Sequence, residues 1–210
     1  MEVIPSTIFH MAHQGLNDHE IQVALAHAFT TLCPDLLYTA PNLLTSRIID
    51  ISNTNQIRHN PDDPTAGPYI LKIAFISAHF YDHSIGRILI DMFLVMKKFQ
   101  LRLNERFYTI QVMVYYLDRN TLLSRTVVDD VTGEKQYVLA MDKSQDDVIV
   151  QNLERHFGRN FVRLPQNVEV IRSVLGGERL DFLFYADVGM EFASYLLAFS
   201  RLATYQVLFA

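Results

Sequence analysis

The sequence predicts an α/β fold built on a parallel sheet, with a short helical segment in front of it. From Tyr69 onward, short apolar runs alternate with amphipathic stretches of helical spacing, and such alternation favours a parallel sheet with right-handed crossovers. The apolar runs at 70–77 and 180–185 are each followed by polar turn residues. Runs of this kind are typical of buried strands.

The N-terminal part is predicted to be helical and separate. Asn17 and Glu20 have the spacing of a capping box, and apolar residues at helical spacing follow until Pro34 ends the helix. From 53 to 68 the composition is polar, with three prolines, which is typical of a linker. We therefore expect a helical segment at 1–52, a linker at 53–68 and the main domain at 69–210.

The main domain is predicted to contain nine regular elements and one excursion. In chain order the elements are strand 70–77, helix 85–99, strand 107–117, helix 146–157, strand 161–164, helix 167–175, strand 180–185, helix 191–202 and strand 205–209. Helix 85–99 is expected to bury the face that carries Ile85, Ile88, Leu89, Met92, Met96 and Phe99. A hairpin is predicted at 129–135 around Thr132-Gly133. The chain ends within an apolar run, so we expect the domain to be truncated at its C-terminus.

Composition narrows the function classes. The 210 residues carry a formal net charge of −5, which argues against nucleic acid as the main partner. Neither a signal peptide nor an apolar stretch of about 20 residues is present, so we predict a cytoplasmic or nucleo-cytoplasmic protein without membrane contact. Cys33 is expected to be a buried, inert thiol. The pairs His10/His13 and His79/His83 lack further ligands, so no metal is expected.

The candidate site lies in the loops after the strands, because a parallel sheet brings them to one edge. The three distinctive loops are His79–Ser84, Tyr116–Asn120 and Ala186–Met190. His83 comes directly before a helix start, where the helix dipole favours a neutral imidazole. Such a ring can accept a proton from a hydroxyl or orient a phosphate. The structural alternative is a hydrogen bond to loop backbone, with Ser84 as the helix cap.

Other residues of these loops are candidates for substrate binding. Gly86, in the first helical turn, allows close approach to backbone N–H groups, or else serves helix packing. Asp187 and Gly189 end a buried strand and can hold a hydroxyl group, or else Asp187 caps the next helix. Gly86 does not belong to a G-x-G-x-x-G motif, and a Walker P-loop is absent. Asp82 stands directly before His83.

Several segments together resemble the O-linked N-acetylglucosamine transferase family, which includes the plant SPINDLY proteins. They are His13-Gln-Gly-Leu-Asn-Asp18, Lys72-Ile-Ala-Phe-Ile-Ser77 with Phe80-Tyr-Asp-His-Ser-Ile-Gly-Arg87, Leu180-Asp-Phe-Leu-Phe-Tyr-Ala-Asp-Val-Gly-Met190, and Leu197-Ala-Phe-Ser-Arg-Leu-Ala-Thr-Tyr-Gln-Val207. The segments occur in family order from about residue 10 to the end. Thr204 stands where the family pattern has proline.

The resemblance implies the N-terminal, acceptor-side half of a GT-B fold, a Rossmann-like parallel sheet with helices on both faces. It implies transfer of a sugar from a nucleotide donor, in the family usually UDP-linked, to a protein acceptor, with no cofactor or metal. His83 matches the family's active-site loop histidine and is expected to be catalytic. Asp82, Ser84, Gly86, Asp187 and Gly189 are expected to bind substrate.

The nucleotide-binding C-terminal domain of the family is missing from the sequence, so we expect little or no transferase activity from this chain alone. Two other interpretations remain open. One is a non-catalytic protein-binding module derived from such an enzyme. The other is a different Rossmann-like enzyme, for which binding of NAD or ATP would be the evidence.

Overall fold

The sheet of this protein is mixed and mostly parallel, and it is flanked by helices. The computed structural model describes residues 17–44, 69–103, 106–129, 135–142 and 147–208. The predicted linker at 53–68, the pair His10/His13 and most of the segment 13–18 lie outside these residues. None of the helices described is long and apolar enough to cross a membrane.

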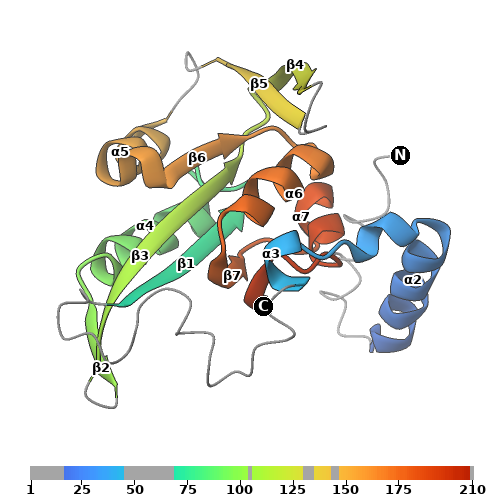
Figure 1. Cartoon of the computed structure of the whole chain (residues 1–210), viewed down its shortest axis with the longest axis horizontal. Helices are drawn as coiled ribbons and strands as arrows, with labels where there is room; N and C mark the ends of the chain where they lie inside the picture. Colours follow the sequence, from blue (N-terminus) through green and yellow to red (C-terminus); the bar gives the residue numbers. More distant parts are fainter. Residues whose placement is uncertain (1–16, 45–68, 104–105, 130–134, 143–146, 209–210) are drawn as a thin grey trace.

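Most elements lie where the periodicity predicts them, and Figure 1 shows their arrangement. After β1 (Tyr69–Ser77) come α4 (Ser84–Met96), β2 (Gln100–Leu103), β3 (Arg106–Leu117), β4 (Thr121–Val128), β5 (Lys135–Met141), α5 (Val148–Phe157) and β6 (Phe161–Leu164). The remaining elements are α6 (Val168–Gly177), β7 (Leu180–Tyr185), α7 (Phe192–Leu197) and β8 (Ala203–Leu208).

The main sheet has the strand order of a doubly wound fold. Its path is β2-β3-β1-β7-β8, and β6 pairs with β3. Both β2 and β6 lie along β3, because β2 pairs with Arg106–Thr109 and β6 with Val114–Leu117. Counted along the chain without β2, the strands lie in the order 3-2-1-4-5, as in the Rossmann fold. Short antiparallel β2 is the exception to the predicted parallel sheet.

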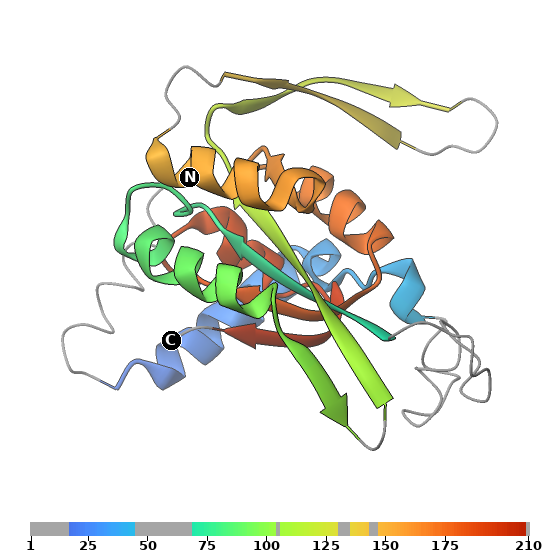
Figure 2. The same cartoon turned by 90° about the vertical axis from the view of Figure 1, so that its left-hand side faces the viewer.

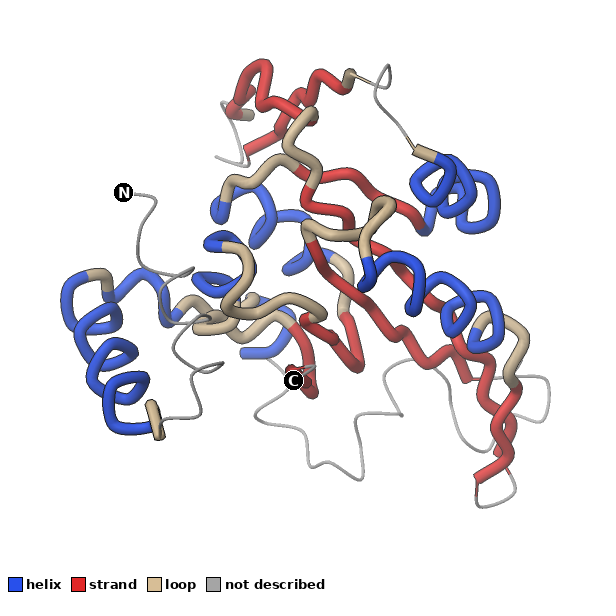
Figure 3. Tube along the Cα trace, turned by 180° about the vertical axis from the view of Figure 1, so that it is seen from behind, coloured by secondary structure: helices blue, strands red, loops and turns tan. Residues whose placement is uncertain are grey.

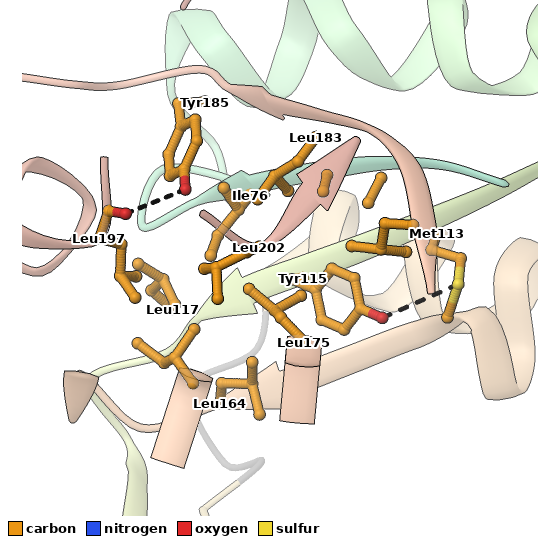
Figure 4. Packing of buried hydrophobic residues seen from close by; sticks show 14 of the residues in the cluster. Ile76, Met113, Tyr115, Leu117, Leu164, Leu175, Leu183, Tyr185, Leu197 and Leu202 are labelled. Atoms are coloured by element: carbon orange, nitrogen blue, oxygen red, sulfur yellow. Dashed lines mark hydrogen bonds between the residues drawn. The ribbon is translucent and has the colours of Figure 1, made fainter. Parts of the chain in front are cut away.

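Both faces of the sheet are buried, which explains why β1 is apolar without interruption from Ile73 to Ile76. Along β1, Ile73 and Phe75 belong to one core cluster, and Ala74 and Ile76 belong to the other. The first cluster packs under α4 and α5, and the second under α6 and α7. Figure 4 shows the second cluster, where the buried Tyr185 hydroxyl donates to the carbonyl oxygen of Leu197 at 3.2 Å. Helices therefore cover both faces.

The N-terminal helices lie on the side of the sheet away from α4 and α5 (Figure 3). They are α2 (His19–Leu32), the short 3-10 helix η1 (Pro34–Leu37) and α3 (Pro41–Leu44). Ala40 is fully buried and its N–H donates to the carbonyl oxygen of Arg201 at 2.9 Å, whereas α2 buries no residue completely. The region around η1 and α3 is thus part of the main fold.

Three expectations need correction. Cys33 is exposed rather than buried, because α2 touches the fold mainly through Phe29, whose ring lies 5.8 Å from that of Tyr195. The cap of α2 is Asp18, one residue later than predicted. Ile88 of α4 was expected to be buried but is 71% exposed, because the residues that α4 buries are Gly86, Leu89 and Phe93.

The hairpin predicted at 129–135 is larger than expected, and 130–134 lie outside the described residues. The antiparallel strands β4 and β5 lie on either side of this segment and form a separate two-stranded sheet. This hairpin extends past α5 at one end of the molecule (Figure 2). Its side chains are mostly exposed on both faces, so the sequence lacks the alternation that marks a strand.

Candidate functional site

The candidate site lies where the strand order reverses. Strands β1 and β7 are neighbours in the sheet, but the chain continues from β1 toward β3 on one side and from β7 toward β8 on the other. The loops after these strands separate at such a switch point and leave room for a ligand. They carry His79, His83 and Asp187.

Asp187 connects the two loops. Its side chain is fully buried, and its Oδ2 accepts hydrogen bonds from the Ser77 hydroxyl at 2.9 Å, from the Ala78 N–H at 2.7 Å and from Nδ1 of His79 at 3.0 Å. The Ser77 hydroxyl oxygen also accepts a bond from the His79 N–H at 2.8 Å. The predicted alternative, that Asp187 caps the next helix, is wrong because Glu191 caps α7.

Two histidine rings and a tyrosine ring lie against one another in this loop. The rings of His79 and His83 are 4.7 Å apart between centroids, and the ring of Tyr81 lies 5.9 Å from His79 and 5.8 Å from His83. His83 is the N-cap of α4, and its Nδ1 accepts the N–H of Ile85 at 3.3 Å. The loop therefore holds both imidazoles at defined positions.

The surroundings of His83 favour its neutral form. Partial burial is the main cause that lowers the pKa of His83 from its ordinary value of 6.5, and the neighbouring His79 lowers it further. The carboxylate of Asp187 acts in the opposite direction and raises the pKa of His83. The predicted neutral imidazole is thus supported, although its main physical cause is burial.

A cavity of about 330 Å³ opens beside these rings. Its lining comes from the ends of β1 and β3 and from the start of α5, namely Ala78, His79, Tyr81, Tyr116, Asp118, Arg119, Asn120, Asp147 and Val150. His79 is the histidine that lines it. The cavity is of a size that suits a side chain or a small polar molecule.

A buried ion pair supports the far wall of the cavity. Asp118 follows β3, and its Oδ2 lies 3.5 Å from Nη1 of Arg163, with both side chains 2% exposed. The same carboxylate accepts the Asn120 N–H at 2.9 Å and the Thr121 hydroxyl at 3.0 Å. Arg119, which also lines the cavity, forms an ion pair of 3.0 Å with Glu191. Asp118 thus orders the loop through its hydrogen bonds.

No family model and no curated protein matches this sequence. The assignment of the site therefore depends on its geometry and on the sequence motifs. Within the described ranges, no group of three or more His, Cys, Asp or Glu side chains is placed to hold a metal ion.

The predicted site residues are only partly brought together. His83 and Asp187 lie on either side of His79. Asp82 is exposed, where its carboxylate accepts Nε of Arg87 at 2.5 Å, and its backbone N–H donates to Asp147. Ser84 begins α4, and its hydroxyl lies 3.5 Å from Nδ1 of His83. Neither Asp82 nor Ser84 lines the cavity.

The two glycines have backbone roles. Gly189 has a φ of +92°, a conformation that other residues rarely adopt, and it lets the loop turn after Asp187. A Cβ on Gly86 would lie 2.2 Å from the carbonyl oxygen of Tyr81 and 3.1 Å from that of His79. The packing alternative for Gly86 is therefore supported, and this packing holds the histidine loop against α4.

Replacing Gly86 by alanine is expected to displace the loop. The clash involves backbone atoms, so relief needs movement of the loop that carries His79 and His83, at a cost of about 1–3 kcal/mol or more. The free energy of unfolding in urea measures the cost, and the imidazole NMR signals report the displacement. The matched control is Gly177→Ala, which adds a Cβ with no atom within 4 Å. Equal stability of the two variants would contradict the packing role.

The stability of the protein is expected to fall in mild acid, partly through His83. Because the folded protein lowers the pKa of His83 below 6.5, the unfolded chain binds the proton more readily. The contribution is therefore complete above 6.5 and is lost as the pH falls from 6.5 through the lower pKa of the folded protein. Urea unfolding between about pH 5 and pH 8 measures it. His83→Asn, which can still cap the helix, should flatten this part of the curve, and an unchanged slope would contradict the assignment.

Sequence reasoning missed His79 and the pair Asp118–Arg163 as parts of the site. The sequence places His79 in the first of the distinctive loops and at metal-ligand spacing from His83, but its decisive partner, Asp187, is distant in the sequence. Arg163 gives a signal, because it is a charged residue inside the short apolar strand β6. Charged residues are rarely buried unless they are paired, so such a residue indicates a buried counter-ion.

Proposed function

We infer that this chain forms the acceptor side of a nucleotide-sugar glycosyltransferase, as the N-terminal half of a GT-B cleft. One observation carries the proposal: Asp187, His79 and His83 gather at the switch point of the sheet, beside an open polar cavity. Neutral imidazoles next to a cavity are suited to proton transfer at a hydroxyl group. The motifs around His83 and Asp187 that resemble glycosyltransferases agree with this reaction.

The charged residues that line the cavity favour binding of the acceptor rather than of the nucleotide-sugar donor. A departing diphosphate needs cationic or dipolar support. Among the residues that line the cavity, Arg119 is the cationic one, and it is already paired with Glu191 at 3.0 Å. The lining also carries the carboxylate of Asp147, which disfavours an anionic ligand, whereas the charge of Asp118 is paired with Arg163. The nucleotide site would then belong to the second GT-B domain.

Ligand titrations of the purified chain test whether the cavity binds the acceptor or the nucleotide-sugar donor. We expect peptides with Ser or Thr to shift the imidazole NMR signals of His79 and His83, and matched peptides with Ala instead to have a smaller effect. UDP-N-acetylglucosamine should not produce a saturable shift. Saturable binding of the nucleotide sugar at these histidines, without binding of the peptides, would contradict the proposal.

A transfer assay tests the chemistry. In the longest natural product that contains this chain, His83→Asn is expected to lower kcat by about 100-fold or more, while the helix cap is retained. The exposed histidine substitution His156→Asn, on α5, is the matched control. Measurable transfer by the 210-residue chain alone would contradict the need for a second domain.

The alternative function is a protein-binding module without chemistry. It is favoured if the peptides bind and the longest natural product transfers no sugar from any nucleotide donor.

A further inference from the structure

The hydrogen bond between His79 and Asp187 defines which nitrogen of His79 carries the proton. An ionised carboxylate only accepts hydrogen bonds, so Nδ1 of His79, 3.0 Å from Oδ2 of Asp187, is the donor. In the neutral ring the other nitrogen, Nε2, is then without a proton and can accept one. His79 lines the cavity and its side chain is 13% exposed, so this basic nitrogen belongs to a ring that a ligand can reach.

The helix cap gives His83 the opposite tautomer. Nδ1 of His83 faces the backbone N–H of Ile85 at 3.3 Å, and a backbone N–H only donates. Nδ1 of His83 must therefore accept, and in the neutral ring the proton is on Nε2. Neutral His83 thus presents a hydrogen-bond donor at its outer nitrogen, and accepting a proton at Nδ1 would break the cap.

The geometry points to a division of roles in which His79, held by Asp187, is the proton acceptor and His83 is a hydrogen-bond donor. This inference rests on the proposed function, and it assigns the proton transfer to a different residue than the sequence motif suggests. His83 does not line the cavity, but its ring lies 4.7 Å from that of His79, and in this inference its Nε2–H donates to a substrate oxygen that gains negative charge next to His79.

The proposed step balances in atoms and electrons. The acceptor hydroxyl gives its proton to Nε2 of His79, and its oxygen forms a bond to the anomeric carbon of the sugar. The bond from that carbon to the phosphate oxygen breaks, and its electron pair leaves with the nucleoside diphosphate. Asp187 stabilises the imidazolium that forms, as in other carboxylate–histidine pairs. Within the described residues its buried Oδ1 receives no hydrogen bond, which leaves this carboxylate charge available to His79.

Tautomers measured by NMR test the inference without any activity assay. Long-range proton–nitrogen correlation of the histidine-labelled 210-residue chain distinguishes the two nitrogens, and it is recorded at a pH above the titration observed for both rings. We expect protonated Nδ1 in His79 and protonated Nε2 in His83. The same tautomer in both residues, or the reverse pair, would overturn the inference.

Two asparagine substitutions identify the signals and separate the roles. An asparagine amide can replace Nδ1 of histidine but leaves nothing in the place of Nε2. His79→Asn therefore retains a donor to Asp187, and His83→Asn retains a helix cap. Asp187→Ala removes the oxygen that accepts Nδ1–H of His79, so it should move the His79 tautomer toward protonated Nε2 and leave His83 unchanged. If Asp187→Ala does not fold, the tautomers of the unsubstituted chain still decide.

Rates then distinguish the inference from the proposed function. In the longest natural product, His79→Asn should lower kcat at least about 100-fold and remove the rise of kcat/KM with pH, whereas His83→Asn should keep that rise. If kcat/KM still rises with pH in His79→Asn but no longer does so in His83→Asn, the inference is overturned. The observation of sugar transfer would still support the proposed function. If the unsubstituted protein transfers no sugar, the proposed function fails. The tautomers of His79 and His83 measured by NMR then decide whether the assigned hydrogen bonds are correct.

Discussion

Asp118→Ala is expected to lower the free energy of unfolding by about 3–5 kcal/mol, because it leaves a buried guanidinium without its nearest carboxylate. The Arg163 side chain is 2% exposed, and the carboxylate of Glu154 also lies 3.6 Å from it, on a side chain that is 40% exposed. The substitution also removes the acceptor for the Asn120 N–H and the Thr121 hydroxyl. Urea unfolding followed by circular dichroism measures the loss.

Two further variants separate charge from hydrogen bonding at this pair. Asp118→Asn keeps an acceptor oxygen for the loop and removes only the charge, so we expect a smaller loss. The double variant Asp118→Leu/Arg163→Met replaces the pair by apolar side chains of similar size, which is often neutral or stabilising for buried ion pairs. A loss below about 1 kcal/mol for Asp118→Ala would show that Arg163 is adequately stabilised without Asp118.

Phe93→Ala should destabilise the fold by a similar amount, about 3–5 kcal/mol. Phe93 is fully buried on α4, and its ring contacts those of Phe75, Phe80 and Phe157 at centroid distances of 4.5, 5.6 and 6.3 Å. Removing the ring leaves a cavity between the sheet and both helices of this face. The denaturation midpoint in urea, compared with the unsubstituted protein, is the measurement.

Ile88→Ala on the same helix is the control for Phe93→Ala. Ile88 is 71% exposed, so its truncation is expected to change the stability by less than about 0.5 kcal/mol. Comparable losses for the two substitutions would mean that the buried face of α4 has been assigned incorrectly.

The sequence predicts the elements of the domain well because both faces of its sheet are covered. Predominantly apolar runs, each interrupted by one charged residue, marked β1 and β7. Helical spacing marked the helices between them, and β6 (161–164) and β7 (180–185) lie at the predicted bounds. The pattern of apolar residues does not predict strands whose side chains are incompletely buried. Strands β4 and β5 expose both faces, and the four-residue β2 is too short for a pattern.

The candidate site was predictable in place but not in detail. A single sequence identifies the loops at the carboxyl ends of the strands, and thereby His83 and Asp187. It does not reveal that Asp187 bonds to His79, since this contact joins residues 108 positions apart. Nor does it distinguish a ligand-binding glycine from Gly86, whose absent side chain makes room for the carbonyl oxygen of Tyr81.

The place of β1 between β3 and β7 also has a consequence for folding. β1 pairs with β3, about 40 residues later, but its other neighbour, β7, follows only after more than 100 residues. Pairings over such separations close slowly, because the entropy of a long loop must be overcome first. During synthesis on the ribosome, β1, α4 and β3 can associate early, whereas the segment with Asp187 emerges later. We therefore expect the candidate site to form late in folding, and hydrogen-exchange pulse labelling should show protection in β3 before β7.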